Sequence, residues 1–510
     1  MESRSLAARL AALDPDRLRG MRRGVEKESL RVRPDGALAT TPHPPALGAA
    51  LTHPRITTDF SESQLELVTG VHGDTGACLR ELTQIHQWVH RALGDELLWA
   101  ASMPCGLPAD DAIPLAQFGS SNIGRAKTVY RMGLSHRYGR RMQTISGIHY
   151  NWSLPGLGNA DYLALIRNFR RHAFLLIYLF GASPAVCESF VVGRPHGLQR
   201  LAGHTMGLPH ATSLRMGRLG YQSEAQAALG VSYNSLERYA ASLEDALTRV
   251  HPAYEAIGLR GPDGAYRQLA TTVLQIENEF YGTIRPKRVI HPGERALHAL
   301  RERGVEYVEV RCLDLDPFEP IGLGAPLLRF LDVFLLHCLL ADSPPDTPQE
   351  ILALSRNQER VASHGREPGL RLEQGGGTAL LTDWAAAVLE GCAPIAARLD
   401  ALDGGSAQTD AVAAARAAVA DDALTPSARV LAAMARDHDG AYVRFVLAQS
   451  AAARRHLLAL PWTAADEAHW HQLSEQSLAA QRAYEAADAL PFEAYRQAYL
   501  ASAGLQPASA

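Results

Sequence analysis

Two glutamates stand two positions apart in the stretch RGVEKESLRV, residues 23–32. Because side chains at positions i and i+2 of a β-strand point to the same face, Glu26 and Glu28 would lie side by side. Neighbouring carboxylates repel each other, so the simplest interpretation is a solvated strand face. A cation held between the two carboxylates would remove the repulsion and allow both to stay ionised in a cleft. The pair therefore raises the question of a metal site.

Four further segments place polar side chains where a strand would bury apolar ones. They are ITTDFSESQLELVTG (56–70), QTISGIHYNWSL (143–154), LQIENEFY (274–281) and VEYVEVRCLDLDPF (305–318). Carboxylates from several strands together with a histidine are a ligand set for a hard cation, and Mg²⁺ is often shared with substrate phosphates. For each segment alone, a solvated glutamate, a hydrogen-bonded core His149 or a surface ion pair between Glu309 and Arg311 remains open. Their accumulation on separate strands indicates a metal-binding cleft.

The elements that must position these residues are of mixed type up to about residue 325 and helical after it. Strands are predicted at 24–33, 64–69, 142–153, 270–280 and 305–314, and helices at 76–98, 159–180 and 235–257. Because strands and helices do not alternate regularly, we expect an α+β protein whose mostly antiparallel sheet is covered by helices. We expect a catalytic region with an N-terminal helix over 1–325, a mainly helical region packed on the sheet over 326–500, and a disordered tail over 501–510.

Composition narrows the class of protein. The chain has 510 residues, of which 47% are hydrophobic and 20% charged, with a formal net charge of −4, so it offers no basic field for nucleic acid. Six cysteines without a CxxC pair argue against a disulfide framework and favour the cytoplasm, with Cys187 and Cys338 expected in the core. The longest apolar run, 173–182, is about half of the roughly 20 residues needed to span a bilayer. We therefore expect no nucleic-acid partner, no membrane partner and no obligate protein partner.

Several common catalytic motifs are missing from the sequence. It contains neither a GxxxxGKS/T phosphate loop, nor an HExxH zinc helix, nor a GxSxG nucleophile elbow. Only three lysines, Lys27, Lys127 and Lys287, stand among 50 Lys and Arg residues, and none of them follows a glycine-rich loop. Any phosphate bound by this chain must therefore be held by metal ions and arginines.

Nine blocks of the sequence resemble the bacterial glutamate–cysteine ligases of the proteobacterial, single-function class. The blocks are RGVEKESLRV, ALTHPRITTDFSESQLELVTG, SMPC, GSSNIGRAKTVYRMGL, MQTISGIHYNWSLP, YLFGASPAVC, ATSLRMGRLGY, VLQIENEFYGTIRPKR and GVEYVEVRCLDLDPFEPIG. The resemblance implies a glutamine-synthetase-like fold with a curved, mostly antiparallel sheet. It also implies a reaction in which ATP phosphorylates the γ-carboxylate of glutamate and the amino group of cysteine then displaces phosphate. The products would be γ-glutamylcysteine, ADP and phosphate, in the first step of glutathione biosynthesis.

The same resemblance implies roles for individual residues. Arg311 matches the catalytic arginine that contacts the transferring phosphate, a role suited to a permanent charge, and Lys287 is the better ATP-phosphate candidate among the lysines. Arg215 and Tyr221 match positions that line the cysteine pocket. So do three aromatic residues for which packing is an equal alternative: Phe60, Tyr130 and Tyr281. The implied ligands of Mg²⁺, with Mn²⁺ as the alternative ion, are Glu26, Glu28, Asp59, Glu66, His149 and Glu309, the last of which is also implied to be catalytic.

Other functions remain compatible with these residues. A related carboxylate–amine ligase with another amino acceptor would keep the metal ligands and change the pocket around Arg215 and Tyr221. A metal-dependent hydrolase would use the carboxylates and His149 to activate water, and it would turn over without ATP. A binding protein without activity is excluded only if the ligand set is assembled in one place.

Overall fold

The fold is built around one antiparallel sheet. The computed structural model describes residues 6–220, 224–227, 229–291 and 293–506, so Tyr221 lies outside the described residues. Neighbouring strands follow the order β2–β3–β1–β5–β10–β9, with β4 pairing to β1, and every pair is antiparallel. The predicted α+β class with a mostly antiparallel sheet is confirmed. The strands are β1 (Arg22–Val32), β2 (Ile56–Thr58), β3 (Gln64–Val68), β4 (Leu97–Leu98), β5 (Ile148–Ser153), β9 (Ile284–Lys287) and β10 (Tyr307–Leu313).

The register of this sheet brings polar residues of different strands side by side. Glu26 on β1 is opposite His149 on β5, and Glu28 is opposite Glu66 on β3. Glu309 on β10 is opposite Asn151, which shares a face of β5 with His149. One face of the sheet therefore collects carboxylates from three strands and an imidazole from a fourth.

The other face of the sheet forms the main hydrophobic core. Val25, Tyr150, Trp152, Val308 and Val310 are each at most 1% exposed and belong to one apolar cluster. α6 (Asn159–Phe180) packs on β9 and β10, and α3 (Thr75–Ala92) packs on β1 and β3. Burial of this face fixes the strand alternation, so the carboxylates must lie on the opposite face.

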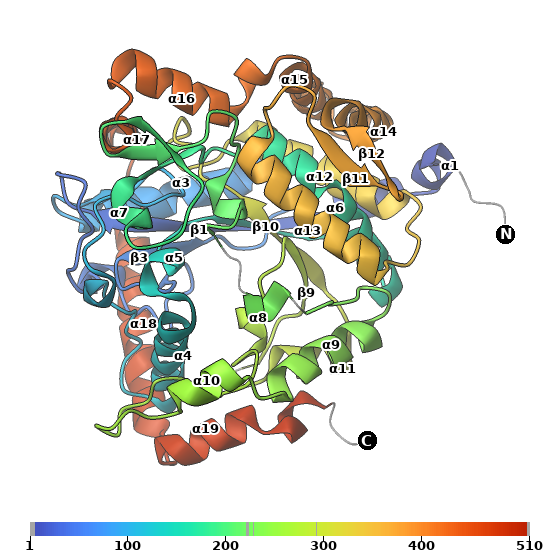
Figure 1. The fold of residues 1–510 in the computed structure, drawn as a ribbon. Helices are drawn as coiled ribbons and strands as arrows, with labels where there is room; N and C mark the ends of the chain where they lie inside the picture. Colours follow the sequence, from blue (N-terminus) through green and yellow to red (C-terminus); the bar gives the residue numbers. More distant parts are fainter. Residues whose placement is uncertain (1–5, 221–223, 228, 292, 507–510) are drawn as a thin grey trace.

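Helices surround the sheet (Figure 1). α6 covers the span 159–180 that the sequence predicts. α12 is buried on most sides because it lies against α6, α14 and α15, which accounts for its almost entirely apolar sequence. The helices up to α12 are α1 (Leu6–Ala11), α2 (Pro15–Arg19), α3 (Thr75–Ala92), α4 (Asn122–Tyr138), α5 (Arg140–Gln143), α6 (Asn159–Phe180), α7 (Glu188–Val191), α8 (Glu224–Ala227), α9 (Leu236–Thr248), α10 (Pro252–Ile257), α11 (Ala296–Arg303) and α12 (Ala325–Leu340).

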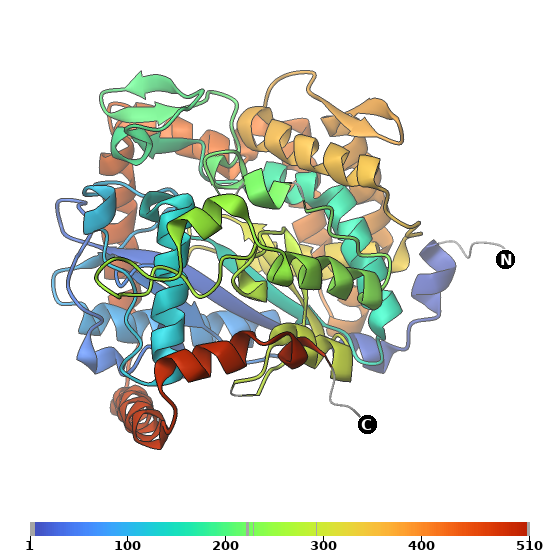
Figure 2. The same cartoon turned by 60° about the horizontal axis from the view of Figure 1, so that its bottom comes forward.

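The region after α12 is helical apart from the hairpin β11 (Arg371–Gln374) and β12 (Gly377–Leu380). Its last long element, α19, returns to pack on α4, as the view from below shows (Figure 2). Residues 502–505, expected in a disordered tail, form a short 3₁₀ helix because Leu505 is buried and its carbonyl accepts a hydrogen bond from Arg301 (2.8 Å). The helices are α13 (Pro348–His364), α14 (Leu381–Asp403), α15 (Ala407–Ala420), α16 (Pro426–Asp437), α17 (Tyr442–Ala459), α18 (Ala464–Ala487) and α19 (Phe492–Leu500).

The strand predicted at 270–280 is not formed. Residues 270–280 form loop structure and the 3₁₀ turn η4 (Glu277–Glu279) instead. Glu279 is fully buried, pairs with Arg137 at 2.9 Å and accepts a hydrogen bond from Gln275 N at 2.7 Å, while Glu277 pairs with Arg295 at 2.9 Å. The alternating pattern was misleading because its glutamates are bonded to side chains of other segments, not exposed on a strand face.

The cysteines are all buried, but two of them are bonded to each other. Cys187 lies in the core, as predicted, and the structure joins it to Cys105 in a disulfide. The two cysteines are 82 residues apart in the sequence, and no local motif predicts that the fold brings them together. Cys338 is a free thiol in the core, as predicted. Strands β6 (Ala185–Cys187), β7 (Gln199–Ala202) and β8 (Thr205–Gly207) form a separate small sheet.

No helix within the described part of the chain has both the length and the apolar character required to cross a membrane.

Candidate active site

A cavity of about 390 Å³ opens on the polar face of the sheet. Most of the residues that the sequence singled out line this one cavity. They come from β1, β3, β5, β9 and β10, from α4 and from the loops after β2 and η4. They are Glu26, Glu28, Asp59, Phe60, Glu66, Tyr130, His149, Tyr281, Lys287, Glu309 and Arg311.

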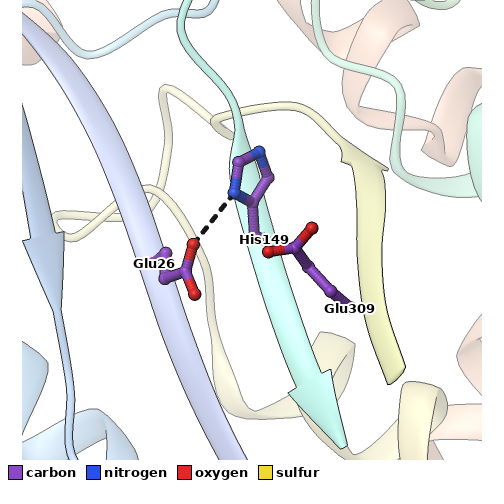
Figure 3. Close-up of side chains that lie close together, drawn as sticks. All are labelled: Glu26, His149 and Glu309. Carbon is purple, nitrogen blue, oxygen red and sulfur yellow. Dashed lines mark hydrogen bonds and ion pairs between the residues drawn. The ribbon is translucent and has the colours of Figure 1, made fainter. Parts of the chain in front are cut away.

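Glu26, His149 and Glu309 form the tightest group in the cavity (Figure 3). One ligand atom from each lies within 4.8 Å of those of the other two. His149 Nδ1 is 3.2 Å from Glu26 Oε2, and Asn151 donates a hydrogen bond of 2.8 Å to the other oxygen of Glu26. Burial and the neighbouring Arg311 charge keep the pKa of His149 below its ordinary value, which favours the neutral, ligating imidazole.

Glu28, Asp59 and Glu66 form a second acidic group beside the first. Burial and the Asp59 charge raise the pKa of Glu28 to about 8, and burial together with Asp59 raises the pKa of Glu66 well above its usual range. Glu28 Oε1 lies 3.8 Å from His149 Nε2, so the two groups adjoin. Glu28 is opposite Glu66 across the β1–β3 pair, and neighbouring carboxylates with little access to water ionise together only if positive charge is supplied. An all-oxygen set with one imidazole suits a hard divalent cation. The donor chemistry therefore fits a metal site.

Glu309 connects the acidic groups to fixed positive charges. Its two oxygens lie 3.1 Å from Lys287 Nζ and 2.8 Å from Arg311 Nη1. Burial alone would raise the pKa of Glu309, but the charges of Lys287 and Arg311 hold it well below its usual value. The reciprocal effect keeps Arg311 protonated. A negatively charged ligand in the cavity would meet both an ammonium and a guanidinium.

Arg215 lies in an adjoining cavity of about 60 Å³. This smaller cavity shares Tyr281 and Arg311 with the large one and also contains Thr283 and Gln358. The hydroxyl of Tyr281 accepts a hydrogen bond of 2.8 Å from Gln143, which fixes the ring between the two spaces. Among the described residues, the predicted substrate residues therefore line two cavities that share Tyr281 and Arg311.

Several cavity residues were not identified from the sequence. Arg285 lies two positions before Lys287 on β9 and 3.9 Å from Glu309, and this i, i+2 relation could have revealed it. Arg131 donates to the carbonyl of Asp59 and stacks on Phe118 at 4.5 Å. Tyr495 and Tyr499 of α19 also line the cavity. Nothing in the sequence links α19 to residues more than 180 positions earlier.

The fold and the cavity together define a class of enzyme. Acidic groups on an antiparallel sheet, next to fixed arginine and lysine charges and without a phosphate loop, are suited to metal-assisted phosphoryl transfer.

Comparison with known proteins then gives the family. Residues 10–361 match the glutamate-cysteine ligase family. The chain is 46% identical to the glutamate–cysteine ligase of Alcanivorax borkumensis over 94% of this chain and 96% of that protein, and 47% identical to that of Pseudomonas paraeruginosa over 98% of each. A glutamate–cysteine ligase from Francisella tularensis, solved in complex with AMP, superposes with a TM-score of 0.90 at 37% identity over 95% of this chain and 98% of that one. The chain belongs to the glutamate–cysteine ligase family, and the resemblance seen in its sequence is confirmed.

Proposed function

We propose that this enzyme joins the γ-carboxylate of L-glutamate to the amino group of L-cysteine, using ATP, and releases γ-glutamylcysteine, ADP and phosphate as the first step of glutathione biosynthesis. The observation that carries the proposal is the meeting of two acidic groups with Arg311 and Lys287 in one cavity of a chain that belongs to this family over most of its length. The AMP bound by the Francisella relative supports a nucleotide as ligand.

The acidic groups are proposed to hold the metal ions. Glu26, His149 and Glu309 would bind one cation, and the carboxylates Glu28, Asp59 and Glu66 would bind a second. Mg²⁺ is the proposed ion, with Mn²⁺ as the alternative, because the donors are mainly carboxylate oxygens. When bound, such ions neutralise triphosphate charge and align the γ-phosphate with the attacking carboxylate.

Arg311 and Lys287 are proposed to contact the transferring phosphate. Both are held by Glu309, so their positive groups are oriented before substrate arrives. A guanidinium keeps its charge while charge shifts during phosphoryl transfer, and its fork can contact two phosphate oxygens. Glu309 thereby serves both as a metal ligand and as the anchor of these two cations.

The smaller cavity is proposed to receive cysteine. Arg215 would pair with the α-carboxylate of cysteine in a two-point contact, which leaves the amino group facing the larger cavity past Tyr281. Phe60, Tyr130 and Tyr281 provide aromatic walls that exclude water from a labile acyl phosphate. Tyr221 retains the cysteine-pocket role that the sequence resemblance implies.

The competing functions are less well supported. A hydrolase would not need Arg311 near a phosphate, and membership of a ligase family argues against it. A ligase with another acceptor would differ in the smaller cavity. The cytoplasm is the proposed location, because the reaction consumes ATP and a reduced thiol and because four buried cysteines are free thiols.

The decisive test is ADP formation from ATP and glutamate in the presence of Mg²⁺, measured with and without cysteine. We expect ADP release that depends on cysteine, with an equal amount of γ-glutamylcysteine. Release of ADP with another amine but not with cysteine would identify a different acceptor. Phosphate release without any acceptor, at the full rate, would identify a hydrolase.

A further inference from the structure

Asp314 is a buried carboxylate to which the reaction described above gives no role. It follows β10 directly and lies three residues after Arg311. Its side chain is fully buried, and its oxygens accept hydrogen bonds from Ala182 N (2.9 Å), Ser183 Oγ (2.5 Å) and Ser213 Oγ (3.0 Å). One carboxylate therefore joins the end of β10 to two segments that are distant from it in sequence.

The segment that Asp314 holds is the one that carries Arg215. Ser213 is the N-cap of the 3₁₀ turn η3 (Leu214–Met216), and its hydroxyl accepts a hydrogen bond from Met216 N. The same hydroxyl donates to Asp314, so the turn that presents Arg215 is fastened to the strand that presents Arg311. Leu214 N donates to Ser183 O at 2.8 Å, which closes the connection between the two held segments.

Asp314 also lies close to the guanidinium of Arg215 itself. Arg215 Nη1 lies 3.9 Å from Asp314 Oδ1, and Nη2 donates a hydrogen bond of 2.9 Å to the carbonyl of Arg311. A guanidinium only 2% exposed needs a counter charge, because burial of an isolated ion is strongly unfavourable. Asp314 lies within ion-pair distance of this guanidinium and supplies negative charge to it, and Arg215 also lines the smaller cavity.

We propose that Asp314 is a positioning residue: it fixes Arg215 at the smaller cavity so that the guanidinium receives the carboxylate of the incoming amino acid. This inference rests on the proposed function, since the acceptor is taken to be cysteine. It predicts that Asp314 affects the acceptor and leaves glutamate and ATP unaffected.

The test is the Asp314→Asn variant, which keeps the shape of the side chain and removes its charge. We expect the KM for cysteine to rise about tenfold or more, the effect of weakening one hydrogen bond to a charged group. The KM values for glutamate and ATP, and kcat at saturating cysteine, should stay within about twofold of the wild type. Equal rises in all three KM values would indicate a general structural defect and would overturn the inference.

Hydroxylamine provides an acceptor without a carboxylate. Its nitrogen attacks the acyl carbon of γ-glutamyl phosphate, the bond from that carbon to the phosphate oxygen breaks, and phosphate leaves with formation of the hydroxamate. Because hydroxylamine offers nothing for Arg215 to bind, hydroxamate formation should be the same in the wild type and in Asp314→Asn. If Asp314→Asn loses activity equally with hydroxylamine and with cysteine, Asp314 does not act through the carboxylate of the acceptor.

Asp332→Asn is a matched control. Asp332 is another buried aspartate, held by Arg23 at 3.0 Å and by the hydroxyl of Tyr150 at 2.6 Å on the core side of the sheet. Its replacement should lower stability without a selective change in the KM for cysteine. If Asp314→Asn does not fold, Ser213→Ala removes one hydrogen bond of the same anchor. It should give a smaller rise in the same KM, and an unchanged value would overturn the inference.

The two levels of failure are distinguishable. A wild-type enzyme that forms neither γ-glutamylcysteine nor hydroxamate would overturn the proposed function. A wild-type enzyme that forms both, with unchanged KM values in Asp314→Asn, would overturn only the role of Asp314.

Discussion

At the scale of single residues, Glu309 links the proposed metal ligands to the two cations proposed to contact phosphate. Its carboxylate is within reach of Lys287 and Arg311 and belongs to the same group as Glu26 and His149. A neutral side chain at this position would remove a ligand from the metal group and leave two half-buried cations without this counter charge. Catalysis should therefore depend on this carboxylate more than folding does.

Replacement of Glu309 by glutamine tests this dependence. We expect kcat to fall about 10²–10³-fold, the usual effect of removing one electrostatic element from a preorganised site, while the circular dichroism spectrum remains that of a folded protein. Glu306→Gln is the control, because Glu306 is 46% exposed and pairs with Arg288 near the same strand. Full activity of Glu309→Gln would show that the site is misplaced.

The three lysines lie in two different environments, although they are the same residue type. Lys287 and Lys127 line the large cavity, whereas Lys27 lies on the core face of β1. Lys27 Nζ donates to Ser29 Oγ at 2.6 Å and lies 3.0 Å from His86 Nε2. Strand alternation predicts this difference, because Lys27 stands between Glu26 and Glu28.

At the scale of elements, the start of β5 has to pass very close to Arg215. Gly147 precedes β5, and its N–H donates a hydrogen bond of 2.6 Å to Glu28 Oε2. A Cβ at position 147 would overlap the Arg215 guanidinium. Because Gly147 has no side chain, its N–H can bond to Glu28 while the Arg215 guanidinium lies close to its backbone.

Gly147→Ala should therefore act on the acceptor site. Because the added methyl group overlaps the buried Arg215 guanidinium, that side chain has to shift, so the thermal midpoint should fall and the KM for cysteine should rise about tenfold or more. Gly197→Ala is the control, because a Cβ at position 197 meets no atom within 4 Å. Steady-state kinetics and a thermal melt of both variants provide the measurement. An unchanged KM for cysteine in Gly147→Ala would mean that Arg215 tolerates displacement.

At the scale of the whole molecule, several largely buried histidines in the described part of the chain have no carboxylate near enough to affect their pKa. Burial lowers the pKa of His43 and His53 to about 4 and that of His90 and His172 to about 3. Each imidazole is neutral in the folded protein and has an ordinary pKa near 6.5 when unfolded. The unfolded chain therefore binds more protons below that pH, and the contribution of these groups to stability is lost as the pH falls.

The resulting prediction is a loss of stability between pH 7.5 and pH 5.5, measured as the urea midpoint. Each buried histidine should contribute about 1 kcal/mol at the lower pH. The raised pKa values of Glu28 and Glu66 act in the opposite direction, so a variant comparison is sharper than the absolute slope. His172 lies between the rings of His337 and Trp384, and His172→Phe should lose less stability on acidification than the wild type. An identical pH dependence in both proteins would contradict the assignment.

Local sequence pattern was enough to predict several features of this protein. Alternation along 23–32 and 305–314 placed Glu26 with Glu28 and Glu309 with Arg311 on shared strand faces, and helical spacing gave α6 its observed bounds. The ordered blocks also identified the family. Each of these signals lies within a short stretch of chain, where backbone geometry relates spacing directly to direction.

Contacts between residues far apart in the chain could be seen only in the folded protein. It turned 274–281 into a loop, brought Tyr495 and Tyr499 of α19 to the large cavity, joined Cys105 to Cys187, and placed Asp314 beside Arg215. These contacts depend on strand register and on the packing of helices from the far end of the chain. Strand register and helix packing are set by the energy of the whole core and not by that of any one segment. A local sequence pattern therefore does not predict them.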